Sequence, residues 1–220
     1  MQERIDLLVD IPFAYRHTCW FCGEPSDQFV TFPHTRHIVL SCPHPQLTLP
    51  SCRECRPFAY QAKVNHVWAV RASVKKSLIH KYRKDLAIGL NWTQEELANA
   101  GFEGGNFESF QRSAWFMYEV ARDRVNFQAW PLSQGGVDID DDIEPITFEF
   151  DGVVYPSIDD AIKHYSGNFR FNRQILVKTL AILGTSQFAK AVRFCRLLIG
   201  ATPNEVNSAL AELKAQQVNR

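Results

Sequence analysis

The stretch Cys19-Trp20-Phe21-Cys22 has a counterpart in Cys52-Arg53-Glu54-Cys55, and residues 23–51 separate the two pairs. A Cys-x2-Cys knuckle lets two thiolates reach one metal ion from a tight turn, and two knuckles complete the four-cysteine shell of structural zinc. Such a shell leaves no open coordination position. We therefore expect one structural zinc ion per chain. Two unrelated knuckles, or a redox pair, are the alternatives.

The insert between the knuckles contains further metal-binding residue types: His34, His37, Cys42 and His44. Their spacing is less regular than that of the knuckles, and two prolines shape the loop. We favour surface imidazoles and a packed free Cys42 over a second metal site. A ligand set that exchanges one knuckle cysteine for His34 or His44 is less economical.

Composition is that of an ordinary globular protein. The chain has 220 residues, of which 45% are hydrophobic and 22% charged, and this excludes wholesale disorder. It has no run of 18 apolar residues, and the N-terminus lacks the apolar core of a signal peptide. We expect a cytoplasmic protein, in a compartment where thiols stay reduced and bind metal.

Charge is unevenly distributed although the net charge is zero. Residues 1–90 carry a net +5, residues 91–165 carry −11, and residues 166–220 carry +6. Two basic segments therefore flank an acidic middle. This pattern indicates surfaces for a polyanion, or segments that neutralise one another across the folded surface.

Around the knuckles the sequence resembles an HNH-type treble-clef zinc domain, over about residues 15–70. The likeness rests on the knuckles with Gly23 and Glu24, on residues 30–34 and on residues 49–55. In that family one Cys-x2-Cys-Gly-Glu knuckle opens a β-hairpin, an Asp-His pair follows on a strand, and a second knuckle opens a helix. The resemblance implies this scaffold and favours nucleic acid as the partner.

The catalytic positions of that family are degenerate here. Pro33-His34 replaces the Asp-His pair, the family's asparagine falls near Gln46 or Leu47, and Arg56 follows the second knuckle. One-metal phosphodiester cleavage needs a base for water and a cation on the scissile phosphate. His34 is the remaining candidate for the base, and no cation site is evident. We expect the scaffold without nuclease activity.

The region after the second knuckle predicts a helix with one apolar face, formed at three- and four-residue spacing by Val67, Val70, Val74, Leu78, Tyr82 and Leu86. Basic residues cover the other faces and continue next to the zinc site. A row of this kind can track phosphates, and it comprises Arg53, Arg56, Lys63, Arg71, Lys75, Lys76, Lys81, Arg83 and Lys84. The solvated face of an amphipathic helix is the alternative.

Two features mark the middle of the chain. Thr93 and Glu96 match a capping box, and an apolar stripe predicts a helix from Asn106 through Val125. Residues 131–145 then have the character of an acidic linker. Its segment 138–144 is a solvated loop in the simplest interpretation and a docking segment for a protein partner in the other.

The C-terminal region predicts a hairpin that turns at Asp151-Gly152, followed by short helices. Residues 152–161 are similar to a small helix-turn-helix module that accompanies HNH-type and related homing nucleases; an ordinary hairpin-to-helix junction is the alternative. The module would extend to about residue 180, with Arg170, Arg173 and Lys178 where its recognition helix would lie. Cys195 falls on an apolar helical face, and Thr202 with Glu205 forms a second capping box.

The sequence as a whole predicts an α+β, mostly helical fold. Residues 1–130 would hold a treble-clef-like zinc module with its basic and supporting helices, residues 131–145 the linker, and residues 146–220 a hairpin with a helical bundle. The favoured function is zinc-stabilised binding of nucleic acid, DNA before RNA. A metal-dependent endonuclease with His34 as base and a protein-interaction adaptor are the alternatives.

Overall fold

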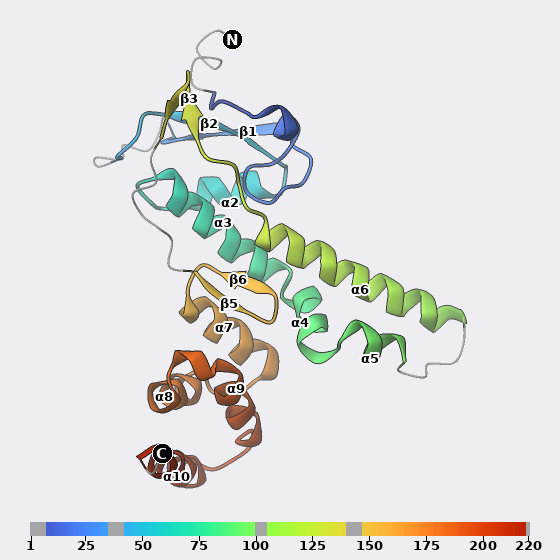
Figure 1. Ribbon diagram of the computed structural model, residues 1–220, viewed down its shortest axis with the longest axis vertical. Helices are drawn as coiled ribbons and strands as arrows, with labels where there is room; N and C mark the ends of the chain where they lie inside the picture. Colours follow the sequence, from blue (N-terminus) through green and yellow to red (C-terminus); the bar gives the residue numbers. More distant parts are fainter. Residues whose placement is uncertain (1–7, 35–41, 100–104, 140–146, 219–220) are drawn as a thin grey trace. The chain divides into compact units, whose positions relative to one another are not determined.

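The computed structural model describes residues 8–34, 42–99, 105–139 and 147–218 (Figure 1). The chain divides into two compact units, residues 1–156 and 157–220. Within the described ranges it is mostly helical with small antiparallel sheets, as the sequence predicts. His37 and most of the acidic segment 138–144 lie outside the described residues.

A hairpin of β1 (Gln28–Phe32) and β2 (Leu47–Ser51) lies between the two knuckles along the chain. The strands are antiparallel, with Val30 opposite Leu49. Both of these side chains are buried, and so are Trp20 and Phe21 from the first knuckle. The described residues around the hairpin therefore contribute buried apolar side chains, although the short strands give little periodic signal in the sequence.

Three helices follow the hairpin: α2 (Cys55–Gln61), α3 (Val67–Lys81) and α4 (Arg83–Asn91). The predicted apolar face is confirmed, because the described helices bury Val67, Val70, Val74, Leu78 and Leu86. The helix is not continuous, since Tyr82 ends α3 and caps α4. His66 begins α3 by accepting a hydrogen bond from the Ala69 N–H, which satisfies one of the unpaired donors of the first turn.

Two further helices complete the helical part of this unit: α5 (Gln94–Ala98) and α6 (Gly105–Asn126). The capping box of Thr93 and Glu96 is present at the start of α5. α6 runs beside α4 and α5 (Figure 1). Its contact with α4 is close, because a Cβ placed on Gly89 would lie 2.2 Å from the Tyr118 ring.

The chain leaving α6 returns to the N-terminal segment. The Trp130 carbonyl accepts a hydrogen bond from the Trp20 indole at 3.1 Å. The Trp130 ring stacks on Tyr15 of the short helix η1 (Phe13–Tyr15). β3 (Ser133–Gln134) and β4 (Val137–Asp138) then form a ribbon whose turn is held by the Asp10 carboxylate. The first part of the expected acidic linker is thus packed onto the first unit.

A second hairpin, of β5 (Phe148–Phe150) and β6 (Val153–Tyr155), ends the first unit. Its predicted turn at Asp151-Gly152 is confirmed, with positive φ at both residues. Asn126 at the end of α6 fixes the hairpin: its amide donates to the Gly152 carbonyl and accepts from the Val154 N–H. This hairpin therefore lies within the first unit, fixed to the end of α6.

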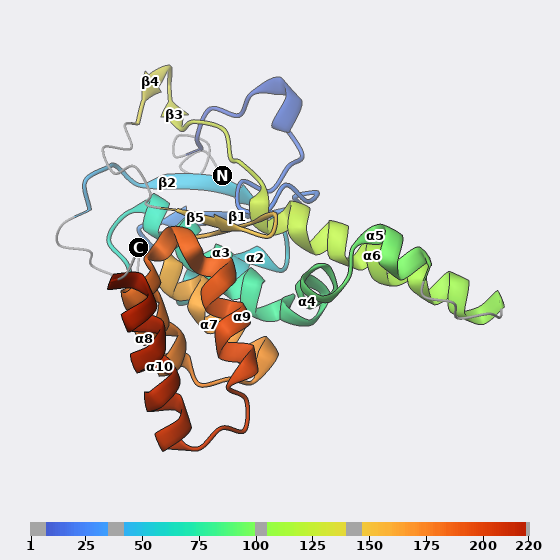
Figure 2. The ribbon, with the colours of Figure 1, turned by 60° about the horizontal axis from the view of Figure 1, so that its bottom comes forward.

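The second unit is a set of short helices: α7 (Ile158–Phe169), α8 (Arg173–Leu183), η2 (Thr185–Gln187), α9 (Phe188–Leu197) and α10 (Pro203–Val218). α8 packs against α7, α9 and α10 (Figure 2). Tyr165, Leu176, Phe188 and Cys195 form its buried centre, which confirms Cys195 as a core residue. Hydrogen bonds between Thr202 and Glu205 confirm the second capping box.

Candidate metal centre

The first knuckle is a tight turn that its backbone hydrogen bonds hold in place. The Gly23 N–H donates to the Cys19 carbonyl, and the Cys19 N–H donates to the Glu24 carbonyl. Gly23 has φ +79°, and a Cβ there would lie 2.6 Å from the Phe127 ring. The turn therefore needs glycine both for its left-handed backbone and for the close approach of Phe127.

The second knuckle joins the end of β2 to the start of α2. Cys52 follows the last residue of the strand, and Cys55 is the first residue of the helix. The Cys55 N–H points at the Cys52 sulfur, with 3.4 Å between nitrogen and Sγ. The turn between β2 and α2 thus places the sulfur atoms of Cys52 and Cys55 close together.

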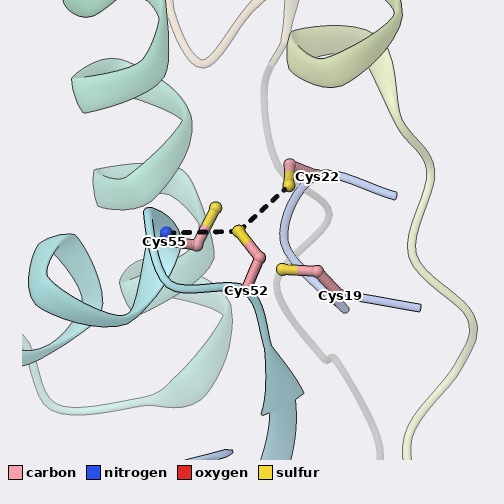
Figure 3. A group of neighbouring side chains, drawn as sticks. All are labelled: Cys19, Cys22, Cys52 and Cys55. Atoms are coloured by element: carbon pink, nitrogen blue, oxygen red, sulfur yellow. Dashed lines mark hydrogen bonds between the residues drawn. The ribbon is translucent and has the colours of Figure 1, made fainter. Parts of the chain in front are cut away.

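The two knuckles bring their four cysteines together (Figure 3). Their Sγ atoms all lie within 4.8 Å of one another, and 3.7 Å separates Cys22 Sγ from Cys52 Sγ. A zinc ion with Zn–S bonds of about 2.3 Å would set the edge of a sulfur tetrahedron at about 3.8 Å. All four residues are buried, and none of them forms a disulfide. The cluster can therefore hold a metal ion.

Hydrogen bonds among the four buried thiols shift their pKa values in opposite directions. The hydrogen bond between Cys19 and Cys22 lowers the pKa of Cys19 and raises that of Cys22. A hydrogen bond with Cys19 likewise lowers the pKa of Cys52 and raises that of Cys55. A bound divalent ion would replace these hydrogen bonds, because a coordinating thiol is deprotonated outright.

Arg124, from the last turn of α6, lies between the acidic residues of the two knuckles. Its Nη2 atom is 3.6 Å from Cys22 Sγ and forms an ion pair with Glu54, and its Nε atom is 3.8 Å from a Glu24 oxygen. The Tyr82 hydroxyl donates to Glu54 at 2.8 Å and accepts from Arg124. One cationic side chain therefore connects the cluster, both knuckles and the junction of α3 with α4.

Sequence reasoning missed Arg124, because about 70 residues separate it from the second knuckle and no motif contains it. Glu54 is one of the two residues between the cysteines of the second knuckle, and the cysteine spacing assigns no role to it. Tyr82 gives a partial signal, because its hydroxyl places a polar group on the predicted apolar face. Its pKa is raised, chiefly by burial and also by its hydrogen bond to Glu54, so the residue has a polar role as well.

Two of the insert's candidate ligands, His44 and Cys42, lie outside the four-cysteine cluster. His44 is buried, its Nδ1 lies 2.8 Å from the Pro45 carbonyl, and its Nε2 accepts from the Val67 N–H at 2.9 Å. Both ring nitrogens thus have partners, and one of these partners is the first residue of α3. Cys42 packs beside this ring, 3.6 Å from Nε2. Among the described residues, only the four knuckle cysteines form a group that could hold a metal ion.

The predicted basic surface contains residues with different surroundings. Lys75 is only 7% exposed, and burial, with a smaller contribution from Arg71, lowers its pKa to about 7. Arg71 donates to the Phe127 carbonyl at 2.6 Å and lies over the Trp20 ring. Lys81 is paired with Glu54. Lys75 is therefore buried inside the fold, and Arg71, which is half-buried, bonds to the chain that follows α6.

The other predicted basic residues are exposed and fall into three groups. Arg53, Arg56 and Lys63 surround α2, while Lys76, Arg83 and Lys84 lie on α3 and α4. In the second unit, Arg170 follows the end of α7, and Arg173 and Lys178 lie on α8. Two are engaged in exposed ion pairs, Arg53 with Asp27 and Arg173 with Asp159, and such pairs contribute little to stability.

His34 lies just beyond β1, at a cavity of about 650 Å³ between β1 and α2. Its ring meets the Tyr60 ring edge-on, with 5.1 Å between the centroids. Lys63 also lines this cavity, and none of the described lining residues is acidic. The predicted base is therefore beside a cation and an aromatic ring, and not beside a carboxylate that could hold a metal ion.

No family model matches the chain, and no curated protein or solved structure is significantly similar to it. Within the described ranges, no helix has both the length and the apolar character needed to cross a membrane.

Proposed function

We propose that this chain binds nucleic acid and that one structural zinc ion, held by Cys19, Cys22, Cys52 and Cys55, organises its first unit on an HNH-like treble clef. The order of elements supports the scaffold: a knuckle, the β1–β2 hairpin, a knuckle at the end of β2, and α2. Four thiolates complete the shell, so the metal stabilises the fold. Reduced thiols suit a cytoplasmic location.

The observation that carries nucleic-acid binding is the composition of the exposed surface around α2. Arg56 and Tyr60 are one helical turn apart and Lys63 follows the end of the helix, all three exposed. Arg56 lies over the Tyr60 ring at 5.4 Å. Basic side chains interleaved with an exposed aromatic ring are typical of surfaces that contact phosphates and stack on bases.

A second exposed basic surface supports the same function. Residues 170–172 connect α7 to α8, and the exposed side chains of α8 include Arg173, Gln174 and Lys178. Two helices joined by a short turn, with polar and basic groups on the second, have the form of a helix-turn-helix. We include α8 in the proposed contact with nucleic acid.

Fluorescence anisotropy with labelled DNA and RNA, at about 50 and 200 mM salt, tests the proposal. We expect binding, and we expect the logarithm of the association constant to fall steeply as the logarithm of the salt concentration rises. The triple variant Arg53→Ala, Arg56→Ala and Lys63→Ala should lower that slope by about 2–3, since each lost phosphate contact removes about 0.7–0.9. The matched control removes three exposed charges elsewhere: Lys190→Ala, Arg193→Ala and Lys214→Ala. Absence of binding at low salt, or equal slopes for both triple variants, would contradict the proposal.

Nuclease activity has weaker support. His34 and Lys63 share a cavity, but no described residue there supplies a carboxylate for a catalytic cation. An active enzyme would nick supercoiled DNA in the presence of magnesium or manganese, and His34→Ala would abolish the nicking. We expect no nicking with either cation.

A role as a protein-interaction adaptor is favoured by one observation. Three large apolar side chains are exposed: Trp92 after α4 at 41%, and Phe116 and Met117 on α6 at 62% and 41%. An adaptor without affinity for nucleic acid would show no binding in the anisotropy assay and would retain a co-purifying protein. We expect binding in the anisotropy assay and no co-purifying protein.

A further inference from the structure

The cavity between β1 and α2 has the size of a ligand pocket and an apolar wall. Its volume of about 650 Å³ lies within the range of small-molecule sites. One wall is Val30, Thr31 and Phe32 of β1, and the other contains three small residues, Ala59, Ala62 and Ala69. Because alanine side chains are small, they leave space open between the strand and the helices.

Groups suited to a heterocyclic base surround this cavity. The Tyr60 and His34 rings lie at right angles to each other, 5.1 Å apart, and Tyr60 is 37% exposed. Asn65 lines the same cavity and is exposed. Its amide can both donate and accept hydrogen bonds, as the edge of an unpaired base requires.

Positive charge lies beside the cavity. Lys63 lines it, and the Arg56 guanidinium lies over the Tyr60 ring. In the described part of the chain, Lys63 and Asn65 have no polar partner of their own, and no described lining residue is acidic. The pocket therefore suits an apolar, planar group attached to an anion.

From this arrangement we infer that the cavity receives one unpaired base of a single-stranded nucleic acid. Tyr60 stacks on the base, Asn65 bonds its edge, and Arg56 and Lys63 contact the neighbouring phosphates. A duplex base is stacked on both faces and paired along its edge, so it cannot enter a concave pocket without leaving the helix. The inference rests on the proposed function and adds a preference for single strands.

The test compares a labelled single strand of about 12 nucleotides with the matching duplex, as DNA and as RNA, by anisotropy at low salt. We expect the single strand to bind at least about tenfold more tightly. Tyr60→Ala should weaken this binding about 5- to 150-fold, the range for loss of one base stack. Tyr60→Phe should retain it, because the ring remains. The control Trp92→Ala removes a similarly exposed ring and should have no effect.

Two further variants keep the result interpretable if Tyr60→Ala fails to fold. Asn65→Ala changes an exposed side chain and should weaken single-strand binding, and Ala62→Phe should do so by filling the cavity. Folding of each variant is checked by its zinc content. If the chain binds nucleic acid but prefers the duplex, or if Asn65→Ala and Ala62→Phe bind as the unaltered chain does, the pocket inference is wrong and the proposed function stands. If no nucleic acid binds at low salt, both are wrong.

Discussion

The Nη2 atom of Arg124 lies 3.6 Å from the Sγ atom of Cys22, although 101 residues separate the two along the chain. A cluster of four thiolates around one divalent ion carries a net negative charge. A cationic side chain next to one of the sulfurs reduces that charge and orients the ligand, as groups around metal sites commonly do. The end of α6 is thereby part of the metal centre.

Arg124→Ala should destabilise the first unit and loosen the metal. Glu54 and Tyr82 would lose a cationic partner at a site where Arg124 and Glu54 have side-chain exposures of only 12% and 17%. We expect a loss of about 3 kcal/mol in the free energy of unfolding and about 10- to 100-fold faster loss of zinc to a chelator. Denaturant titration and a colorimetric zinc-release assay measure the two effects.

The control for this variant is Arg122→Ala, two residues away. Arg122 pairs with its neighbour Asp123, which is 68% exposed, and such a surface pair contributes about 0.5 kcal/mol. Equal effects of the two substitutions would show that Arg124 acts only as a surface charge.

Two glycines near the ends of helices should respond to alanine in opposite directions. At Gly89 in α4 a Cβ would lie 2.2 Å from the Tyr118 ring, so Gly89→Ala should destabilise the first unit by about 1–3 kcal/mol through overpacking. At Gly167 in α7 a Cβ meets nothing within 4 Å, so Gly167→Ala should stabilise the second unit by about 0.5–1 kcal/mol. Thermal unfolding curves report both signs, and the same sign for both variants would contradict the packing of α4 on α6.

Lys75→Met should stabilise the first unit and leave nucleic-acid affinity unchanged. Burial lowers the pKa of Lys75 to about 7, so its charged form is disfavoured inside the fold. A thioether of similar length removes that cost, and we expect a gain of about 2 kcal/mol at neutral pH. Anisotropy measures the affinity, and denaturant titration of the same preparation measures the stability. A clear loss of affinity would show that Lys75 contributes to nucleic-acid binding.

The second unit should lose stability in mild acid through His164. Burial lowers the pKa of His164 to about 4, and its Nε2 lies 2.9 Å from the Asn168 amide nitrogen. An unfolded chain, with an ordinary pKa near 6.5, binds the proton first. Stability is therefore complete above about pH 6.5 and falls as the pH drops towards 4, by about 3 kcal/mol in all.

Hydrogen exchange of the α7 and α8 amides between pH 4.5 and 7.5 follows this loss, after correction for intrinsic exchange rates. His164→Gln should remove the pH dependence, whereas His80→Gln, at an exposed position of α3, should leave it intact. A second unit equally stable at both ends of the range would contradict the effect of burial on His164.

The sequence predicted features that local rules govern. The cysteine spacing, the capping boxes at Thr93 and Thr202 and the turn at Asp151-Gly152 each depend on a few neighbouring residues, and all are present in the structure. The interior position of Cys195 followed from helical periodicity in the same way.

Features set by distant parts of the chain could not be predicted. Phe127 packs on Gly23 and Arg124 reaches Cys22 because the end of α6 crosses the first knuckle, and no local pattern encodes such a crossing. Lys75 has the sequence context of a solvated lysine, yet it is buried. The start of the expected linker is fixed by Asp10, more than 120 residues earlier. For the same reason, loss of metal should disturb α6 as well as the zinc module.

Zinc per chain, measured by mass spectrometry of metals on the purified protein, tests the four-cysteine centre most directly. We predict a value near one for the unaltered chain and for Cys42→Ser, since Cys42 packs beside His44 outside the cluster. Cys52→Ser should bring it near zero, because that thiol is one of the four whose sulfurs lie within 4.8 Å of one another. A chain without zinc, or one that loses it in Cys42→Ser and keeps it in Cys19→Ser, would contradict the account.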